Sequence, residues 1–268
     1  MSDGRRVQLQ PAYVLHHRPY RDTSRILELF TRDYGRVSVF ARGARGARKT
    51  GAALASILQP FNRVLVSWSG KGEAGQLTGA EFDGAMAMLP PDRLVSGFYL
   101  NELLLKLFAR HDGHPDVFSL YDATLASLKI DPDGVRALRL FEKRLLDALG
   151  YGLSLERDCD LGRPLDPRYA YRYRLDQGAM RIDGVAEGAG IFSGSTLLAV
   201  AREDFTDPTV CAEARTLLRA ALDRCLEGKE LRTREVAHNA ASRRCHVRKS
   251  LPRRTGSWPS VSRTKSSS

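Results

Sequence analysis

Residues 24–41, SRILELFTRDYGRVSVFA, give the clearest local indication of the fold. Two apolar runs, 24–31 and 36–41, flank a short connection whose last three residues are DYG. In the second run Val37 and Val39 alternate with their neighbours, and a period of two is typical of a β-strand. Glycine adopts the positive φ angles that tight turns between strands require. The stretch therefore predicts a β-hairpin.

Three further runs with strand character flank this hairpin, at residues 7–18, 61–69 and 74–82. A basic, glycine-studded segment, RGARGARKTG at 42–51, separates the hairpin from the fourth run and is expected to be a loop. Five short strands with a long loop after the third predict a small barrel of the oligonucleotide-binding (OB) type over residues 1–82. A plain five-stranded sheet and an SH3-like barrel are the alternatives.

Apolar residues recur every three or four positions from about residue 90 onward, which is typical of helices. Asp92 is the expected N-cap of the first helix, and Gly150 is expected to end the third. These segments form a predicted helical domain over 90–156 and 191–236, so the fold class is α+β. The predicted helices are 94–108, 116–128, 133–149, 193–202 and 208–226.

An irregular insert is expected at residues 157–190, which are rich in Gly, Asp and Pro, with a short strand around Tyr171. The four cysteines are scattered and form no CxxC pair, so we expect an insert without metal and no cofactor. Residues 237–268 are basic and Ser-rich, and they are expected to form a disordered tail.

Positive charge is unevenly distributed along the chain. Residues 1–82 carry 13 Lys and Arg against 6 Asp and Glu, residues 83–236 carry 21 against 25, and residues 237–268 carry 8 against none. Because the N-terminal and C-terminal segments are basic, a polyanionic partner is favoured, and nucleic acid is the first candidate. An RNA-binding OB protein of translation or RNA processing is an alternative, because a basic barrel neutralises RNA as well as DNA.

The basic loop is the main candidate for phosphate contact, since small spacers let a backbone approach its cations. A solvated loop that only aids solubility is the other interpretation. Aromatic residues of the barrel could also stack on bases, although most are expected in its core. The candidates for stacking are Tyr13, Tyr20, Tyr34, Phe40, Phe61 and Trp68. The predicted DNA-binding residues are Arg36, Arg42, Arg45, Arg48, Lys49 and Arg63.

The predicted helix at 133–149 combines basic and apolar residues. Such a surface could bind an acidic peptide with an apolar end, and a solvated charged helix face is an equally good interpretation. The predicted peptide-binding residues are Arg136, Arg139, Phe141, Arg144 and Leu145.

Enzymatic activity is not expected. The sequence contains no GxSxG, Walker A or HExxH pattern, and GARG at 43–46 lacks the GK[ST] ending of a phosphate-binding loop. No apolar run approaches 18 residues and the N-terminus has no signal-peptide core, so we expect no membrane association and a cytoplasmic protein.

Most of the sequence resembles the RecO family of bacterial recombination mediators. The matching segments keep the family's order and spacing from the start to about residue 236. They are YVLHHRPYRDTSRILELFTRDYGRVSVFARGAR (13–45), LQPF (58–61), SWSGKGEAGQLTGAE (67–81), GFYLNELLLKLFARHDGHPDVFSLYDATLASL (97–128), LRLFEKRLLDALGYG (138–152), YRYR (171–174) and GKELRTREV (228–236).

The resemblance implies an N-terminal OB barrel, a central helical domain and a zinc-ribbon-like insert. It also implies a DNA repair and recombination protein that binds single- and double-stranded DNA and anneals complementary strands. Its implied partners are the acidic C-terminal tail of single-strand-binding protein, RecR and, indirectly, RecA. Two departures stand out: only Cys159 remains of the four insert cysteines that hold zinc in some members, and residues 237–268 replace the family's short apolar ending.

Overall fold

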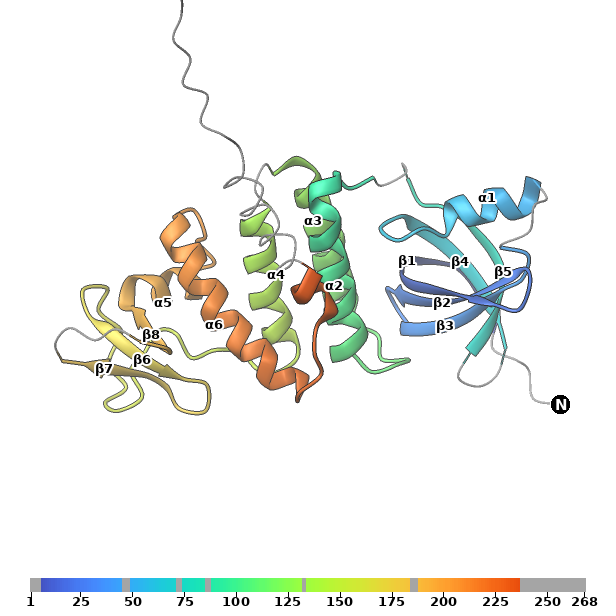
Figure 1. The fold of residues 1–268 in the computed structure, drawn as a ribbon. Coiled ribbons are helices and arrows are strands. Elements are labelled where there is room, and N and C mark those ends of the chain that lie inside the picture. The colour runs from blue at the N-terminus through green and yellow to red at the C-terminus, as the bar shows by residue number, and fades with distance from the viewer. Residues whose placement is uncertain are drawn as a thin grey trace, which may run out of the picture.

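The computed structural model describes residues 6–44, 49–70, 74–84, 88–131, 134–183 and 188–236. A closed five-stranded barrel stands at one end, helices fill the centre, and a small three-stranded sheet lies at the other end (Figure 1). The predicted OB-like barrel followed by a helical region is confirmed. The barrel strands close in the order β1-β2-β3-β5-β4, and they are β1 (Arg6–Tyr20), β2 (Ser24–Thr31), β3 (Gly35–Ala41), β4 (Arg63–Ser69) and β5 (Ala74–Phe82).

The predicted hairpin is formed by β2 and β3, whose antiparallel pairing begins with Thr31 opposite Gly35. Gly35 has a φ of +60°. The hydroxyl of Thr31 donates a hydrogen bond to the carbonyl oxygen of Gly35 at 2.8 Å, which closes the turn. β3 also pairs in parallel with β5, and this pairing closes the barrel.

One helix in the barrel region was not predicted. Residues expected to end the loop at 42–51 instead begin α1 (Lys49–Ile57), and residues 45–48 lie outside the described part. Leu54 and Ile57 of α1 pack against the interior cluster of the barrel. The helix forms because the barrel end offers a surface that buries its apolar side, a contact that the local sequence does not reveal.

The helical region follows the predicted segments closely. Its helices are α2 (Leu94–Leu107), α3 (Pro115–Ile130), α4 (Val135–Ala148), α5 (Gly194–Ala201) and α6 (Pro208–Leu226). The predicted cap of the first helix is wrong: residues Pro91–Arg93 form a 3-10 turn, and Arg93 precedes α2 without a side-chain cap. No helix within the described ranges is long and apolar enough to cross a membrane.

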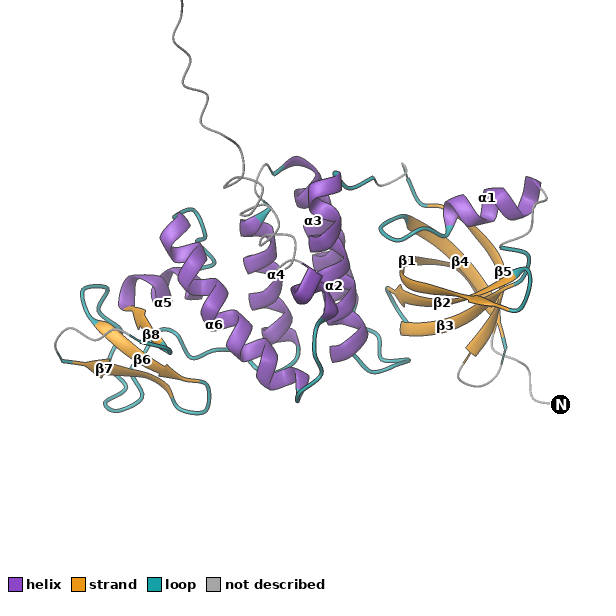
Figure 2. Ribbon diagram, viewed as in Figure 1, coloured by secondary structure: helices purple, strands orange, loops and turns teal. Residues whose placement is uncertain are grey.

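The insert is more regular than predicted. It contains β6 (Ala170–Arg174), β7 (Gly178–Ile182) and β8 (Ile191–Ser193), ordered β7-β6-β8, as Figure 2 shows at the end away from the barrel. The expected strand around Tyr171 is β6. β7 was missed because apolar and polar residues do not clearly alternate in GAMRI. The segment forms a strand through its antiparallel pairing with β6.

A single apolar cluster joins the barrel wall, the helices and the insert sheet. Tyr13, Phe30 and Phe61 of the barrel belong to the same cluster as Tyr121 of α3 and Tyr171 of β6. A second cluster, with Val14 and Leu27 among its members, fills the barrel itself. The barrel is therefore packed against the helices through its outer wall.

The β2–β3 turn provides a test of this packing. A Cβ atom on Gly35 would collide with the main chain of Asp112, in the α2–α3 loop, whereas one on Gly43 would meet nothing within 4 Å. Both glycines have positive φ angles. We expect Gly35→Ala to lower the free energy of unfolding by about 3 kcal/mol and the matched control Gly43→Ala by about 1 kcal/mol.

Urea unfolding followed by circular dichroism measures both values. Equal losses of stability would mean that the turn does not press on the α2–α3 loop, and the close approach of Gly35 to Asp112 would then be wrong.

Candidate nucleic-acid interface

The outer wall of β1, β2 and β3 is divided into a covered and an uncovered half. Near the β2–β3 turn, the helices cover Tyr13 and Phe30: the ring of Phe118 lies 5.5 Å from Tyr13 and 5.8 Å from Phe30. Toward the β1–β2 turn, the strand register places Arg18 opposite Ile26, and Ile26 opposite Phe40. Residues directly opposite in antiparallel strands face the same way, so these three side chains share the uncovered half.

Two aromatic rings meet on this uncovered half. The ring centroids of Tyr20 and Phe40 are 5.2 Å apart with an interplanar angle of 49°, and both side chains are half-buried. The guanidinium of Arg21 lies 5.3 Å from the Tyr20 centroid. Gln76 donates a hydrogen bond to the carbonyl oxygen of Phe40 at 2.9 Å, which holds the backbone beneath its ring.

The other aromatic residues considered for stacking are placed differently. Tyr13, Phe61 and Trp68 are buried in the two cores. Tyr34 is half-buried and packs edge-on against Trp68 at 5.5 Å. Tyr20 and Phe40 are half-buried and share the uncovered half of the wall, where Arg21 lies against the Tyr20 ring.

Two more arginines lie at the same end of the barrel as the ring pair. Arg18 and Arg42 are exposed, and neither forms an ion pair with any other residue that the structure describes. Arg42 follows directly after Ala41, which pairs with Arg25 of β2, so it lies at the same end of the barrel. We call the set Arg18, Tyr20, Arg21, Ile26, Phe40 and Arg42 the aromatic–arginine patch.

Two predicted DNA-binding residues have structural roles instead. Arg36 donates hydrogen bonds to the carbonyl oxygens of Leu105 and Phe108 at 2.6 and 2.7 Å, and burial lowers its pKa. Arg63 is ion-paired with Asp83 and Asp122, each at 2.7 Å. These pairs raise the pKa of Arg63 despite its partial burial. A phosphate would have to displace these partners, so both arginines tie the barrel to neighbouring elements.

The remaining predicted DNA contacts belong to the basic loop. Arg42 is exposed, whereas Arg45, Arg48 and the side chain of Lys49 lie outside the described residues. Phosphate binding by these four residues stays a prediction. Sequence reasoning missed Arg18 and Arg21, although the motif RPYR at 18–21 already places two arginines around an aromatic ring.

The peptide-binding face predicted on α4 does not exist as one surface. Phe141 and Leu145 are fully buried in the core and cannot meet a peptide. Arg144 lies about 140° around the helix from Arg139 because it is five residues further on. It binds Glu203 through two nitrogen atoms, with a shortest distance of 2.7 Å, and the interaction lowers the pKa of Glu203. Arg136 is exposed near the start of α4.

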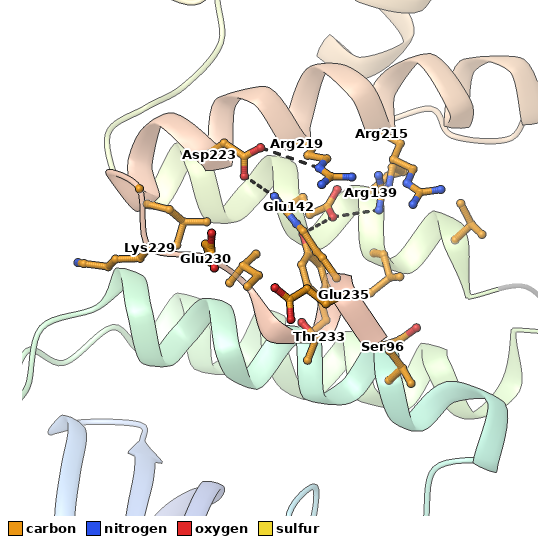
Figure 3. A pocket seen from close by; sticks show the side chains of 18 residues that line it. Ser96, Arg139, Glu142, Arg215, Arg219, Asp223, Lys229, Glu230, Thr233 and Glu235 are labelled. Atoms are coloured by element: carbon orange, nitrogen blue, oxygen red, sulfur yellow. Dashed lines mark hydrogen bonds and ion pairs between the residues drawn. The ribbon is translucent and has the colours of Figure 1, made fainter. Parts of the chain in front are cut away.

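Arg139 opens onto a groove of about 950 Å³ between α2, α4, α6 and the segment 228–235. Figure 3 shows Arg139 of α4 together with Arg215 and Arg219 of α6 on one side of this groove. Sequence reasoning missed the α6 pair, although its i, i+4 spacing already places both residues on one helix face. The lining residues are Val95, Ser96, Tyr99, Val135, Leu138, Arg139, Glu142, Arg215, Arg219, Asp223, Leu226, 228–231 and 233–235.

A buried ion pair forms the floor of the groove. Arg139 bonds Glu142 at 2.9 Å, and the hydroxyl of Tyr99 donates to the same carboxylate at 2.7 Å. Burial raises the pKa of Glu142, while Arg139 acts in the opposite direction. The Nε and Nη1 atoms of Arg139 are buried and have no hydrogen-bond partner among the described residues. The Oε2 atom of Glu142 is likewise buried without a partner among the described residues, and buried unpaired polar atoms are costly.

Possible metal ligands do not gather in the described part of the chain, where no three His, Cys, Asp or Glu residues come together in a suitable group. Cys159 is exposed, and its sulfur lies near Asp160.

Comparison with known proteins agrees with this architecture. The model of the family described as Recombination protein O N terminal matches residues 6–84, and that described as Recombination protein O C terminal matches residues 90–235. The chain is 44% identical over 234 residues to DNA repair protein RecO of Dechloromonas aromatica, covering 86% of this chain and 95% of the relative.

Other relatives carry the same name. The chain is 47% identical over 241 residues to DNA repair protein RecO of Alkalilimnicola ehrlichii, covering 89% of this chain and 94% of the relative. It is 41% identical over 240 residues to DNA repair protein RecO of Methylococcus capsulatus, covering 90% and 97%. With both parts of the architecture matched in order and at these identities, the chain belongs to the RecO family of DNA repair proteins.

Proposed function

We propose that this chain is a recombination mediator that binds single- and double-stranded DNA through its barrel and anneals complementary strands. With RecR it would help to load the RecA recombinase onto DNA coated by single-strand-binding protein, within the nucleoid. The observation that supports it most directly is the combination of exposed barrel arginines with a groove in the helical region that carries Arg139, Arg215 and Arg219 on one side (Figure 3). Family membership favours DNA over the RNA alternative.

The barrel would supply the DNA contacts. Its exposed cations include Arg18 and Arg42, and the predicted loop residues Arg45, Arg48 and Lys49 follow directly. Guanidinium groups bind phosphate through two parallel hydrogen bonds, and they release counterions when they do. Annealing would follow because neutralised strands repel each other less. No covalent bond is made or broken in this scheme.

The groove would receive the acidic tail of single-strand-binding protein. The exposed Arg215 would meet its carboxylates near the groove rim, and Arg219 would do so in exchange for its ion pair with Asp223, which spans 3.9 Å. Val95, Leu138 and Leu226 provide apolar surface for an aromatic end of the peptide. Helix-lined grooves bind peptides in this way when apolar anchors and complementary charges coincide.

Two modest contacts on one chain would act together. Once the groove holds the tail, the barrel lies near the coated strand at a high effective concentration. The coat can then be weakened locally without a tight contact at either site. The barrel would serve as the DNA-binding domain and the helical region as the protein-binding domain.

Replacing the four loop residues tests the DNA contacts. We expect the quadruple variant Arg42→Ala, Arg45→Ala, Arg48→Ala and Lys49→Ala to bind single strands more weakly. The slope of log K against log salt should shrink by about 0.7 for each phosphate that the variant no longer neutralises. Fluorescence anisotropy with a labelled oligonucleotide over a salt series measures this slope.

The control removes four exposed arginines from the helical region and the insert. These residues form no ion pairs within the described part of the chain, and the variant loses the same total charge. Its salt slope should stay at the wild-type value, and a decrease equal to that of the loop variant would assign the effect to net charge alone. The control residues are Arg163, Arg172, Arg202 and Arg224.

A charge reversal on α6 tests the groove. Arg215→Glu should lower affinity for a synthetic acidic peptide ending in Phe by about tenfold or more, since a charge-assisted hydrogen bond contributes about 1.5–3 kcal/mol. Arg224→Glu makes the same change on an exposed residue of the same helix outside the groove, and should bind the peptide normally. Isothermal titration calorimetry with both variants measures the difference. If the two lose affinity equally, the tail binds elsewhere.

A further inference from the structure

The aromatic–arginine patch combines partly exposed apolar side chains with arginines, whereas a barrel wall that contacts only water needs no apolar side chains. Tyr20, Ile26 and Phe40 leave apolar surface partly open to solvent in the half that the helices do not cover. Nearby positive charge exceeds negative charge, since residues 18–25 contain three arginines and one aspartate. Glu28, the next acidic residue on this face of β2, is ion-paired with Arg36 and Arg110 at 3.6 and 2.8 Å.

Aromatic surface ringed by cations suits a ligand with flat faces and regular negative charge. An unpaired base has a π-face that stacks on tyrosine or phenylalanine, and its phosphates lie within reach of neighbouring arginines. In a duplex, the same faces are covered by the neighbouring base pairs. The face of strands 2 and 3 and the loop between strands 1 and 2 are also where OB barrels commonly bind single strands.

The rings are held in place before any ligand arrives. Phe40 is fixed by the 5.2 Å contact with Tyr20 and by the bond from Gln76 to its own carbonyl. Tyr20 ends β1 opposite Ser24, so the short β1–β2 turn limits its movement. A platform ordered in advance loses less entropy on binding than a flexible one.

We infer that Tyr20 and Phe40 stack on unpaired bases of single-stranded DNA, while Arg18, Arg21 and Arg42 hold the adjoining phosphates. The patch makes the chain prefer single strands to duplex at this face. The inference rests on the proposed function, because it gives the DNA-binding barrel a defined ligand. Its test changes only the two uncharged rings, so it is separate from the test of the basic loop, with which the patch shares Arg42.

Two single variants of the full chain test the inference. Tyr20→Leu and Phe40→Leu retain apolar bulk, and urea unfolding confirms that each is folded. We expect each to lower affinity for an oligo(dT) strand about fivefold or more, the effect of removing one stacking ring. Affinity for a duplex of equal length should change less than twofold, and the salt slope should stay unchanged because no cation is removed.

Tyr169→Leu is the matched control. Tyr169 is another partly exposed tyrosine beside an arginine, with the Arg181 guanidinium 3.5 Å from its centroid, but it lies in the insert. This variant should bind both DNA forms like the wild type. Photocrosslinking provides a second measurement on the unaltered protein: an oligonucleotide carrying 5-iododeoxyuridine should crosslink to Tyr20 or Phe40, as identified by mass spectrometry.

The outcomes separate the two proposals. If the ring variants bind single strands like the wild type, or lose single-strand and duplex affinity equally, the stacking inference is wrong while DNA binding stands. Crosslinks confined to other residues would overturn it as well. If the wild type binds neither DNA form at low salt, the proposed function itself fails, and the stacking inference fails with it.

Discussion

The structure depends on the burial of both faces of β1 and β2. Along β1, Ala12 and Val14 face the barrel core, whereas Tyr13 and Leu15 belong to the core shared with the helices. Along β2, Leu27 and Leu29 lie inside, and Phe30 lies outside against Phe108 and Phe118. One pair of strands thus carries two cores on opposite sides. Removing the helices would expose large aromatic residues to water, at about 25 cal/mol for each Å².

Polar bonds at this junction determine which arginines remain available to a ligand. The amide of Asn101 donates to the carbonyl oxygen of Leu15 at 2.9 Å, and Tyr121 donates in turn to Asn101. Arg36 and Arg63 are occupied with carbonyl and carboxylate partners on the helices and at the end of β5. Arg18 and Arg42, which have no ion pair among the described residues, reach solvent at the other end of the barrel wall, where the aromatic–arginine patch lies.

Helix α4 also has residues that pack in the core and residues that line a possible binding surface. Its apolar side anchors the bundle through Phe141 and Leu145, while Arg139 and Glu142 form a buried pair that opens onto the groove. A buried ion pair is weak evidence for stability, because desolvation offsets much of its attraction. Two nitrogens of Arg139 and one carboxylate oxygen of Glu142 have no hydrogen-bond partner among the described residues, which adds to that cost. The groove and the patch thus combine cationic groups with apolar surface.

The five barrel strands, the hairpin turn at Gly35 and helices α2 to α6 could be predicted from the sequence, because these follow from local periodicity and from glycine at a tight turn. The sequence also carried the family resemblance. Tertiary structure alone decided that residues 49–57 form a helix, that Phe141 and Leu145 are buried, and that Arg36 and Arg63 bind other protein groups. Their partners lie far along the chain: Arg36 meets carbonyls 69 and 72 residues away, and Arg63 meets a carboxylate 59 residues away. Charge can be counted along a chain, but its availability to a ligand depends on which groups the fold brings beside it.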